Sequence, residues 1–169
     1  MLLKESLEQQ IYDAGLFKHR TQLAGRLEGV LVGNTIVTDS LLTPYRDNCV
    51  TCHELEHSRL DTKNLIYTPK DLRDKIEADV LRQTVFKLVP IDALAFLFMG
   101  GARSADEFSD ALEIDEEFFL SAIEMYNGIY GGKCVKDGWV MTFNPFSVHK
   151  KKAPSHSRAR TEKKICSLK

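Results

Sequence analysis

The chain has 169 residues, the size of one domain, and its 23 Lys and Arg nearly balance 24 Asp and Glu. No apolar run approaches the roughly 20 residues needed to span a bilayer, and the first residues lack the apolar stretch of a signal peptide. We therefore expect a cytoplasmic protein with no membrane partner, a setting in which structural disulfides are rare. The four cysteines, Cys49, Cys52, Cys134 and Cys166, are accordingly expected to be free thiols.

The charge is unevenly distributed along the chain. Residues 150–169 hold eight Lys or Arg and one acid, a net charge of +7, which leaves −8 for residues 1–149. This last segment is also poor in apolar residues, as disordered segments are. The sequence therefore predicts a domain over residues 1–149 and a basic, disordered tail over residues 150–169, which can contact nucleic acid weakly through its charge.

The beginning of the chain is predicted to form a helix. Apolar residues at helical spacing favour an amphipathic helix over residues 1–14. Residues 16–28 show no clear period, although Leu16, Phe17 and Leu23 are expected to pack on the core.

A β-hairpin and a long helix are predicted next. Residues 29–39 indicate two short strands around a tight turn at Gly33-Asn34, since both turn residues tolerate positive φ. An edge strand in this place can bind an extended peptide through backbone hydrogen bonds. A helix then spans residues 46–60, with Val50 and Leu60 expected to face the core.

The second half of the chain is predicted to be mostly helical. After a loop at residues 61–67, Thr68 as N-cap and Pro69 at the first helical position begin a helix that ends near Leu88. Further helices are predicted over residues 91–99, 105–112 and 115–126, and a second hairpin over residues 134–143 with its turn at Asp137-Gly138. Core residues are expected at Phe108, Leu112, Phe118, Phe119, Ile123 and Tyr126.

One stretch carries the strongest chemical signal: residues 52–57, Cys-His-Glu-Leu-Glu-His, which read H-E-x-x-H. Residues four apart lie on one helix face, so His53 and His57 can bind the same metal ion. Glu54 lies about 100° around the helix, beside a water that the metal would activate. The pattern is typical of a zinc hydrolase with two His ligands and a carboxylate base.

A zinc site of this type needs a third protein ligand. The downstream candidates are Asp61, Asp74, Glu77 and Asp79. We favour Glu77, because the nineteen residues that separate it from His57 allow a loop and the first turns of a second helix to fold back. The small Ala78 would permit a close approach of the two helices. Asp61, four residues after His57, is the main competitor, and Asp79 is the third choice.

With these residues placed, residues 20–149 resemble the ImmA/IrrE family of small zinc metallopeptidases. The segments that resemble it are the hairpin at 29–39, Cys-His-Glu-Leu-Glu-His, Ile76-Glu77-Ala78-Asp79, Lys87-Leu88-Val89-Pro90, residues 116–126, and Tyr130-Gly131 with the hairpin before Phe143-Asn144-Pro145-Phe146. H-E-x-x-H is shared with many families, so the order and spacing of all the segments carry the resemblance.

The resemblance implies a zincin-like α+β fold, in which an H-E-x-x-H helix and further packed helices accompany a small β-sheet. It implies that His53, His57 and Glu77 bind Zn²⁺ and that Glu54 is the general base. It also implies a metalloprotease, a hydrolase encoded on a phage or mobile element. Such an enzyme cleaves a helix-turn-helix repressor and so derepresses the element's genes.

The sequence departs from the family pattern at two places. Glu56 stands where the family often has Gly, which adds negative charge near the helix, and Leu81-Arg82 replaces the more usual Phe-Ala. Neither departure removes a predicted ligand, but both bear on activity.

A second motif overlaps the first. Residues 49–53 read C-x-x-C-H, the attachment signature of a c-type haem, which would make His53 an axial ligand. That interpretation requires export and leaves Glu54, His57 and Glu77 without a role. Cys49 and Cys52 could also form a redox pair or bind a structural zinc ion, and the simplest interpretation is that they are small residues on the helix.

The alternative from another functional class is a non-catalytic regulator. Such a protein would bind a repressor or another protein and would keep a structural or unused zinc site. No segment resembles a helix-turn-helix, so sequence-specific DNA binding is not predicted.

Overall fold

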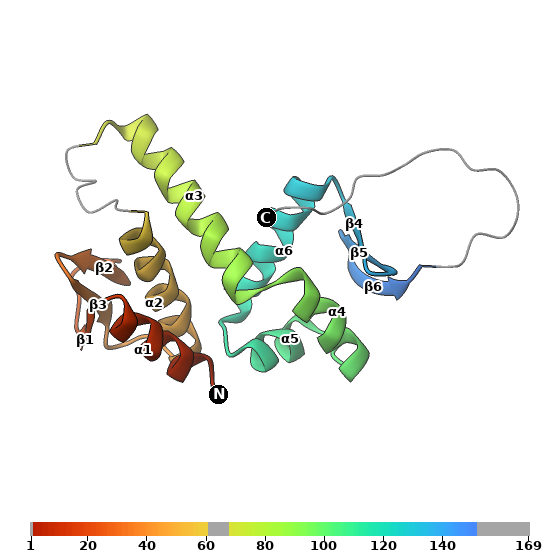
Figure 1. Ribbon diagram of the computed structural model, residues 1–169, viewed down its shortest axis with the longest axis horizontal. Coiled ribbons are helices and arrows are strands. Elements are labelled where there is room, and N and C mark those ends of the chain that lie inside the picture. The colour runs from red at the N-terminus through yellow and green to blue at the C-terminus, as the bar shows by residue number, and fades with distance from the viewer. Residues whose placement is uncertain (1, 61–67, 152–169) are drawn as a thin grey trace, which may run out of the picture.

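The computed structural model describes residues 2–60 and 68–151 (Figure 1). These residues form an α+β structure with two separate three-stranded sheets, which confirms the predicted class. The helices are α1 (Leu3–Asp13), α2 (Pro44–Arg59), α3 (Lys70–Leu88), α4 (Ile91–Gly100), α5 (Ala105–Leu112) and α6 (Glu116–Tyr130). The strands are β1 (Phe17–Thr21), β2 (Gly29–Val32), β3 (Thr35–Asp39), β4 (Lys133–Lys136), β5 (Trp139–Phe143) and β6 (Phe146–Lys150). The loop predicted at residues 61–67 and tail residues 152–169 lie outside the described residues.

The first sheet contains the predicted hairpin and one strand that the sequence pattern did not indicate. Its order is β1-β3-β2, with β2 antiparallel and β1 parallel to β3. The turn between β2 and β3 has Gly33 at φ 62°, as expected. β1 reads Phe-Lys-His-Arg-Thr and is mostly exposed, so no alternation of apolar residues marks it. Phe17 is 64% exposed, which makes its predicted core position wrong, whereas Leu16 is buried.

α2 is the most enclosed helix of the first half. Thr43 caps it by accepting a hydrogen bond from the backbone N–H of Arg46, and Pro44 occupies the first turn. The helix packs on α1, on α3 and on strands β2 and β3, so it is surrounded on several sides (Figure 1). Leu60, predicted to face the core, is 45% exposed because it lies at the C-cap, beyond the last packed turn.

α3 packs beside α2 through its second half. Its buried residues Val80, Thr84, Val85 and Leu88 all lie there, and Figure 1 shows the first turns extending past the end of α2. Leu72 is consequently exposed, although its spacing fits the apolar face. The N-cap residue is Pro69 and not Thr68, because the backbone of Pro69 is still extended.

The stretch Lys70–Gly100 is long and apolar enough to cross a membrane by length and composition alone. It is not one continuous helix, since Pro90 separates α3 from α4. Part of its most apolar window, 39%, is buried inside the protein. A core helix of a soluble domain passes the same test, so this stretch is weak support for a membrane span.

The second half of the protein packs helices α4 to α6 against the second sheet. Ser104 and Glu107 form the capping box of α5, and Asp115 caps α6, which continues four residues past the predicted end. The predicted hairpin is confirmed as β4 and β5, and β6 adds a third strand. β6 ends at Lys150, so the first residue of the predicted tail belongs to the sheet.

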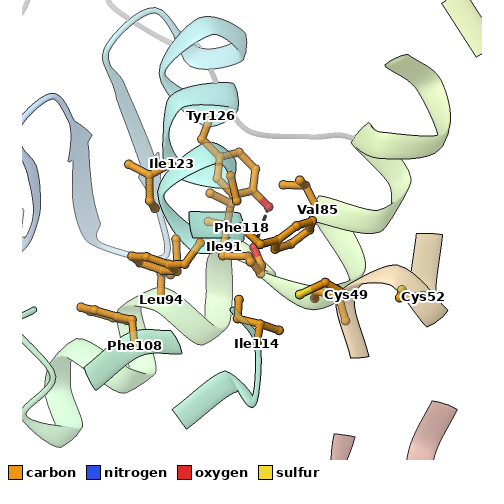
Figure 2. Close-up of a cluster of buried hydrophobic side chains, with 14 of the residues drawn as sticks. Cys49, Cys52, Val85, Ile91, Leu94, Phe108, Ile114, Phe118, Ile123 and Tyr126 are labelled. Atoms are coloured by element: carbon orange, nitrogen blue, oxygen red, sulfur yellow. Dashed lines mark hydrogen bonds between the residues drawn. The ribbon is translucent and has the colours of Figure 1, made fainter. Parts of the chain in front are cut away.

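Aromatic side chains fill the core between these elements. Figure 2 shows side chains of α4, α5 and α6 gathered in this cluster, among them Leu94, Phe108 and Tyr126. Tyr126 stacks on Phe86, Tyr130 and Phe143, and its hydroxyl donates to the backbone oxygen of Val89 at 2.7 Å. This bond joins α6 to the end of α3, and the predicted core position of Tyr126 is confirmed.

The cysteines only partly follow the prediction. Cys49 and Cys52 are free and buried, as expected. Cys134 on β4 is disulfide-bonded, so the prediction that its thiol is free is wrong. A disulfide depends on the approach of two Cα atoms to within about 7 Å, and sequence spacing does not reveal that distance. Cys166 lies outside the described residues.

The Tyr126→Phe substitution should lower the free energy of unfolding by about 1–2 kcal/mol, because it leaves a buried backbone carbonyl without this donor. Tyr12→Phe is the matched control, since the Tyr12 side chain is 79% exposed. Urea denaturation of both variants checks the prediction, which is contradicted if the two variants are equally stable.

Candidate metal centre

The start of α2 is held to the first sheet by a buried carboxylate. Asp47 is only 6% exposed, and it accepts hydrogen bonds from Lys18 of β1 at 2.6 Å and from Thr38 of β3 at 2.7 Å. A buried carboxylate is tolerated when a cation and hydrogen bonds compensate its lost hydration. Asp47 therefore fixes α2 relative to two strands.

Arg46 makes a second connection from the same turn of α2. Its guanidinium binds both carboxylate oxygens of Glu28, at 3.1 and 2.7 Å, and lies 3.4 Å from Asp115. The hydrogen bonds that Arg46 donates to Glu28 raise the pKa of Arg46 against the opposing effect of burial. This cluster joins α2 to the residue before β2 and to the N-cap of α6.

Three side chains from α2 and α3 converge on one point. The Nε2 atoms of His53 and His57 are 3.2 Å apart, and Oε2 of Glu77 lies 3.4 Å from the first and 3.2 Å from the second. Ligands at about 2.0–2.1 Å from a tetrahedral zinc ion stand roughly 3.3–3.4 Å from one another. The three atoms thus fit one face of such a tetrahedron, and within the described residues they are the group able to hold a metal ion.

The surroundings of His53 favour the protonation state that a metal requires. Burial, and then the neighbouring His57, lower the pKa of His53, so its imidazole is neutral at physiological pH. Neutral imidazole and ionised carboxylate are the forms that bind metal. The His57 side chain is 9% exposed, whereas that of Glu77 is 43% exposed, so the group is accessible from the side of α3.

Glu54 lies next to this group but does not belong to it. It is 8% exposed, and burial, followed by the charge of Glu77, raises the pKa of Glu54 to about 7. A hydrogen bond from the backbone N–H of Leu31 lowers the pKa of Glu54 and so opposes these two effects. A carboxyl group with this pKa can both accept and return a proton near neutral pH.

The β2 strand approaches α2 so closely that it needs a glycine. A Cβ atom on Gly29 would lie 2.3 Å from a methyl carbon of Val50 and 3.4 Å from the Glu54 side chain. The first distance is too short for any side chain, so a larger residue would push the strand from the helix. Gly29 therefore sets the distance between β2 and Glu54.

The outer edge of β2 faces the metal group. The backbone N–H of Asp39 donates to the backbone oxygen of Glu28 at 2.8 Å. In an antiparallel pair, every second residue forms hydrogen bonds to the partner strand. The backbone groups of Gly29 and Leu31 therefore point away from β3. The bond from Leu31 to Glu54 shows that this edge is turned to the centre. The sheet order leaves β2 at an edge, as the predicted peptide-binding strand requires.

The other predicted ligands are not in the group. Asp79 is exposed and pairs with Arg82 at 2.9 Å on its own helix, and Asp74 is exposed. Asp61 lies outside the described residues. Ala78 is exposed, so the close approach of α2 and α3 does not depend on it. The buried residues of α3 are instead Val80, Thr84, Val85 and Leu88.

Glu56 is surrounded by cations that sequence reasoning did not assign to it. Its carboxylate binds Lys87 of α3 at 2.9 Å and Arg59 of α2 at 2.7 Å. Arg59 also donates to Gln10 of α1 at 3.0 Å. The added charge of Glu56 is therefore compensated, and it joins three helices. No sequence period pairs Glu56 with Lys87, since they are 31 residues apart.

The two cysteines of the C-x-x-C-H motif lie on the buried side of α2. Cys49 is 3% exposed and Cys52 is fully buried, and burial raises the pKa of each thiol to about 12. Thiols with such pKa values are poor nucleophiles and poor metal ligands. His53 meets His57 and Glu77, not these thiols, so the geometry disfavours the haem and redox interpretations.

No protein-family model matches the chain, and no curated protein is similar to it. The family resemblance therefore rests on the order and spacing of the segments in the sequence.

Replacing Glu56 by Gln should lower the free energy of unfolding by about 2 kcal/mol, because Lys87 would lose a charged hydrogen-bond acceptor in a partly buried place. The exposed Glu124, replaced in the same way, is the matched control and should be neutral. Urea denaturation measures both. Equal stability of the two variants would show that the Glu56 network contributes nothing.

Cys49 and Cys52 should resist alkylation by iodoacetamide at pH 8 in the folded protein, because thiols with a pKa of about 12 are almost fully protonated there. In denaturant both should react at the rate of an ordinary cysteine. Mass spectrometry of the peptide that contains both residues checks this. Rapid modification before unfolding would contradict the buried positions.

Proposed function

We propose that this protein is a zinc-dependent metallo-endopeptidase with a zincin-like arrangement of its active helix, edge strand and third ligand. The observation that carries the proposal is the convergence of His53, His57 and Glu77 beside the buried Glu54. His₂Glu with an open fourth position is the ligand set of zinc hydrolases. Structural zinc sites instead have four protein ligands.

The environment of Glu54 supports a catalytic and not a structural role. Among the described residues no cation pairs with it, although its side chain is buried. Burial of a carboxylate without a compensating cation costs stability, so it is expected mainly where chemistry uses it. This contrasts with Asp47 and Glu56, which are equally buried and are both bound by lysines.

The residues of this chain divide the proposed reaction between them. Zinc, when bound, supplies the Lewis acidity that acidifies a water and polarises a peptide carbonyl. The open edge of β2, through the backbone groups of Gly29 and the carbonyl oxygen of Leu31, holds the substrate as an added strand, while the Leu31 N–H stays with Glu54. Glu54 accepts the proton of the attacking water and delivers it to the nitrogen of the leaving amine. Burial raises the pKa of Glu54 to about 7, so Glu54 can carry out both proton transfers near neutral pH.

The proposed substrate is a helix-turn-helix repressor in the cytoplasm, and its cleavage derepresses phage or mobile-element genes. The support for this substrate is the family resemblance of the sequence. The net charge of −8 over residues 1–149 agrees with it, since a DNA-binding partner is usually basic and opposite charges accelerate encounter.

The decisive test measures zinc content and cleavage together. The wild-type protein should bind one zinc ion, and His57→Ala should lose it, because it removes one of three ligands. Glu54→Ala should keep the zinc and lose cleavage of the repressor encoded nearest to the gene by roughly 10²–10⁴-fold. Metal analysis and gel assays report the two quantities separately.

Asp79→Ala is the control for both measurements, since Asp79 lies on α3 near Glu77 but outside the group. It should retain zinc and activity. A folded wild-type protein without zinc would overturn the metal site. Zinc binding with no cleavage of any repressor would instead favour the non-catalytic regulator.

A further inference from the structure

A groove of about 210 Å³ lies between α4 and the second sheet, and it shares no residue with the candidate metal centre. Its apolar walls include Phe96 and Met99 of α4 and Trp139 and Met141 of β5. Phe96 is 70% exposed and Met99 is 54% exposed, so two large apolar side chains lack a cover among the described residues. Exposed apolar side chains that line a groove are typical of a contact surface.

The charged residues of the groove leave a net negative charge. Asp92 and Lys136 both line it and lie 2.6 Å apart, so their charges compensate each other. Asp137 also lines the groove, and it forms no ion pair within the described parts of the chain. The groove therefore suits a segment that combines apolar side chains with positive charge.

The last described residue lies at the edge of this groove. The backbone N–H of Lys151 donates to the backbone oxygen of Gly138 at 2.7 Å, and Gly138 stands between two lining residues, Asp137 and Trp139. The 18 residues that follow, 152–169, therefore continue from this place. An extended segment of that length can span up to about 60 Å, whereas α4 is only about 15 Å long. The segment is long enough to lie along the whole groove.

The composition of residues 152–169 matches the groove. They include six Lys or Arg and one Glu, a net charge of +5. Their only large aliphatic side chains are Ile165 and Leu168, which directly follow Lys163 and Lys164 in a Lys-Lys-Ile-Cys-Ser-Leu stretch. Positive charge and apolar side chains thus occur together in one short stretch of this segment.

Cys134 provides an independent link to the same segment. It is disulfide-bonded, whereas Cys49 and Cys52 are free. Of the four cysteines in the sequence, only Cys166 is left as a partner within the chain. A disulfide holds its two Cα atoms within about 7 Å of each other. This pairing brings Cys166, with its apolar neighbours, to β4.

The face of the second sheet on which Cys134 lies is the one that lines the groove. Cys134 is paired with Met141, and Lys136 is paired with Trp139. Residues directly opposite each other, and residues two apart on one strand, have their side chains on the same face. Met141, Lys136 and Trp139 all line the groove. Because β4 is at an edge of the sheet, a segment can approach Cys134 from the open side.

We propose that residues 152–169 dock in this groove, that a disulfide between Cys166 and Cys134 anchors them there, and that reduction of this bond releases them. A dithiol opens the bond by supplying two electrons and two protons, so that Cys134 and Cys166 become thiols and the dithiol becomes a disulfide. In a reducing compartment such a bond is transient. The oxidised protein covers the groove, and the reduced protein exposes both the groove and the basic segment to a partner. This inference does not depend on the proposed zinc peptidase.

The first test maps the disulfide in the full-length protein purified without reductant. Mass spectrometry after non-reducing digestion should recover the peptide of Cys134 linked to the peptide of Cys166. Electrophoresis without reductant should show a monomer. A free Cys134 thiol would overturn the proposal. A covalent dimer through Cys134 would also overturn it and would identify a second copy as the partner.

The second test follows Trp139, which lines the groove and is the only tryptophan in the chain. Dithiothreitol should shift its emission to longer wavelength and increase its quenching by acrylamide, because reduction uncovers it. Cys166→Ser should resemble the reduced wild type with or without dithiothreitol. Ser167→Ala is the matched control, since it keeps the thiol and should behave as the wild type. Emission that does not respond to reduction would show that the segment does not cover the groove.

The third test changes the groove itself. The equilibrium with glutathione gives the effective concentration of one thiol at the other, and Phe96→Ser should lower it roughly fivefold because docking then buries less apolar surface. Leu120→Ser is the control, because Leu120 is exposed on α6 and does not line the groove. Equal values for the two variants would overturn the docking site even if the disulfide forms.

Discussion

The enclosure of α2 by other elements is the constraint on which the whole site depends. α2 packs against α1, α3 and the first sheet, although it carries several polar and charged side chains that become buried. Burial of such groups is unfavourable unless each finds a partner. Asp47 and Glu56 find theirs in lysines from β1 and α3. Among the described residues, the remaining buried carboxylate, Glu54, is bound only by the Leu31 N–H, and it lies beside the candidate metal ligands.

The same ion pairs that stabilise α2 also place the three side chains that could hold a metal ion. Arg46 and Asp47 fix the beginning of the helix against the first sheet and α6, while Glu56 fixes its later turns against α3. Glu77 reaches the two imidazoles because α3 is held at this position. The contacts that position α2 are therefore ion pairs, which depend on direction. The second half of the protein is instead held by aromatic packing around Tyr126.

The candidate metal centre, the edge of β2 and an adjoining cavity of about 290 Å³ share the same few residues. Gly29 allows β2 to approach the helix, Leu31 contacts Glu54, and Glu54 and His53 form a wall of the cavity. A substrate strand on β2 would thus be aligned with the proposed base and with the cavity at once. Such alignment matters for catalysis, because the reacting groups must be held close to their productive geometry.

The sequence by itself determined the local features. The H-E-x-x-H pattern placed His53 and His57 on one helix face, and Gly33-Asn34 and Asp137-Gly138 marked two hairpin turns, because these properties depend on residues close in the chain. Only the tertiary structure decided that Glu77 meets the histidines while Asp79 does not. It also decided that Glu56 meets Lys87 and that β1 pairs with β3. Those contacts join residues far apart in the chain, and no local period encodes the distance between them.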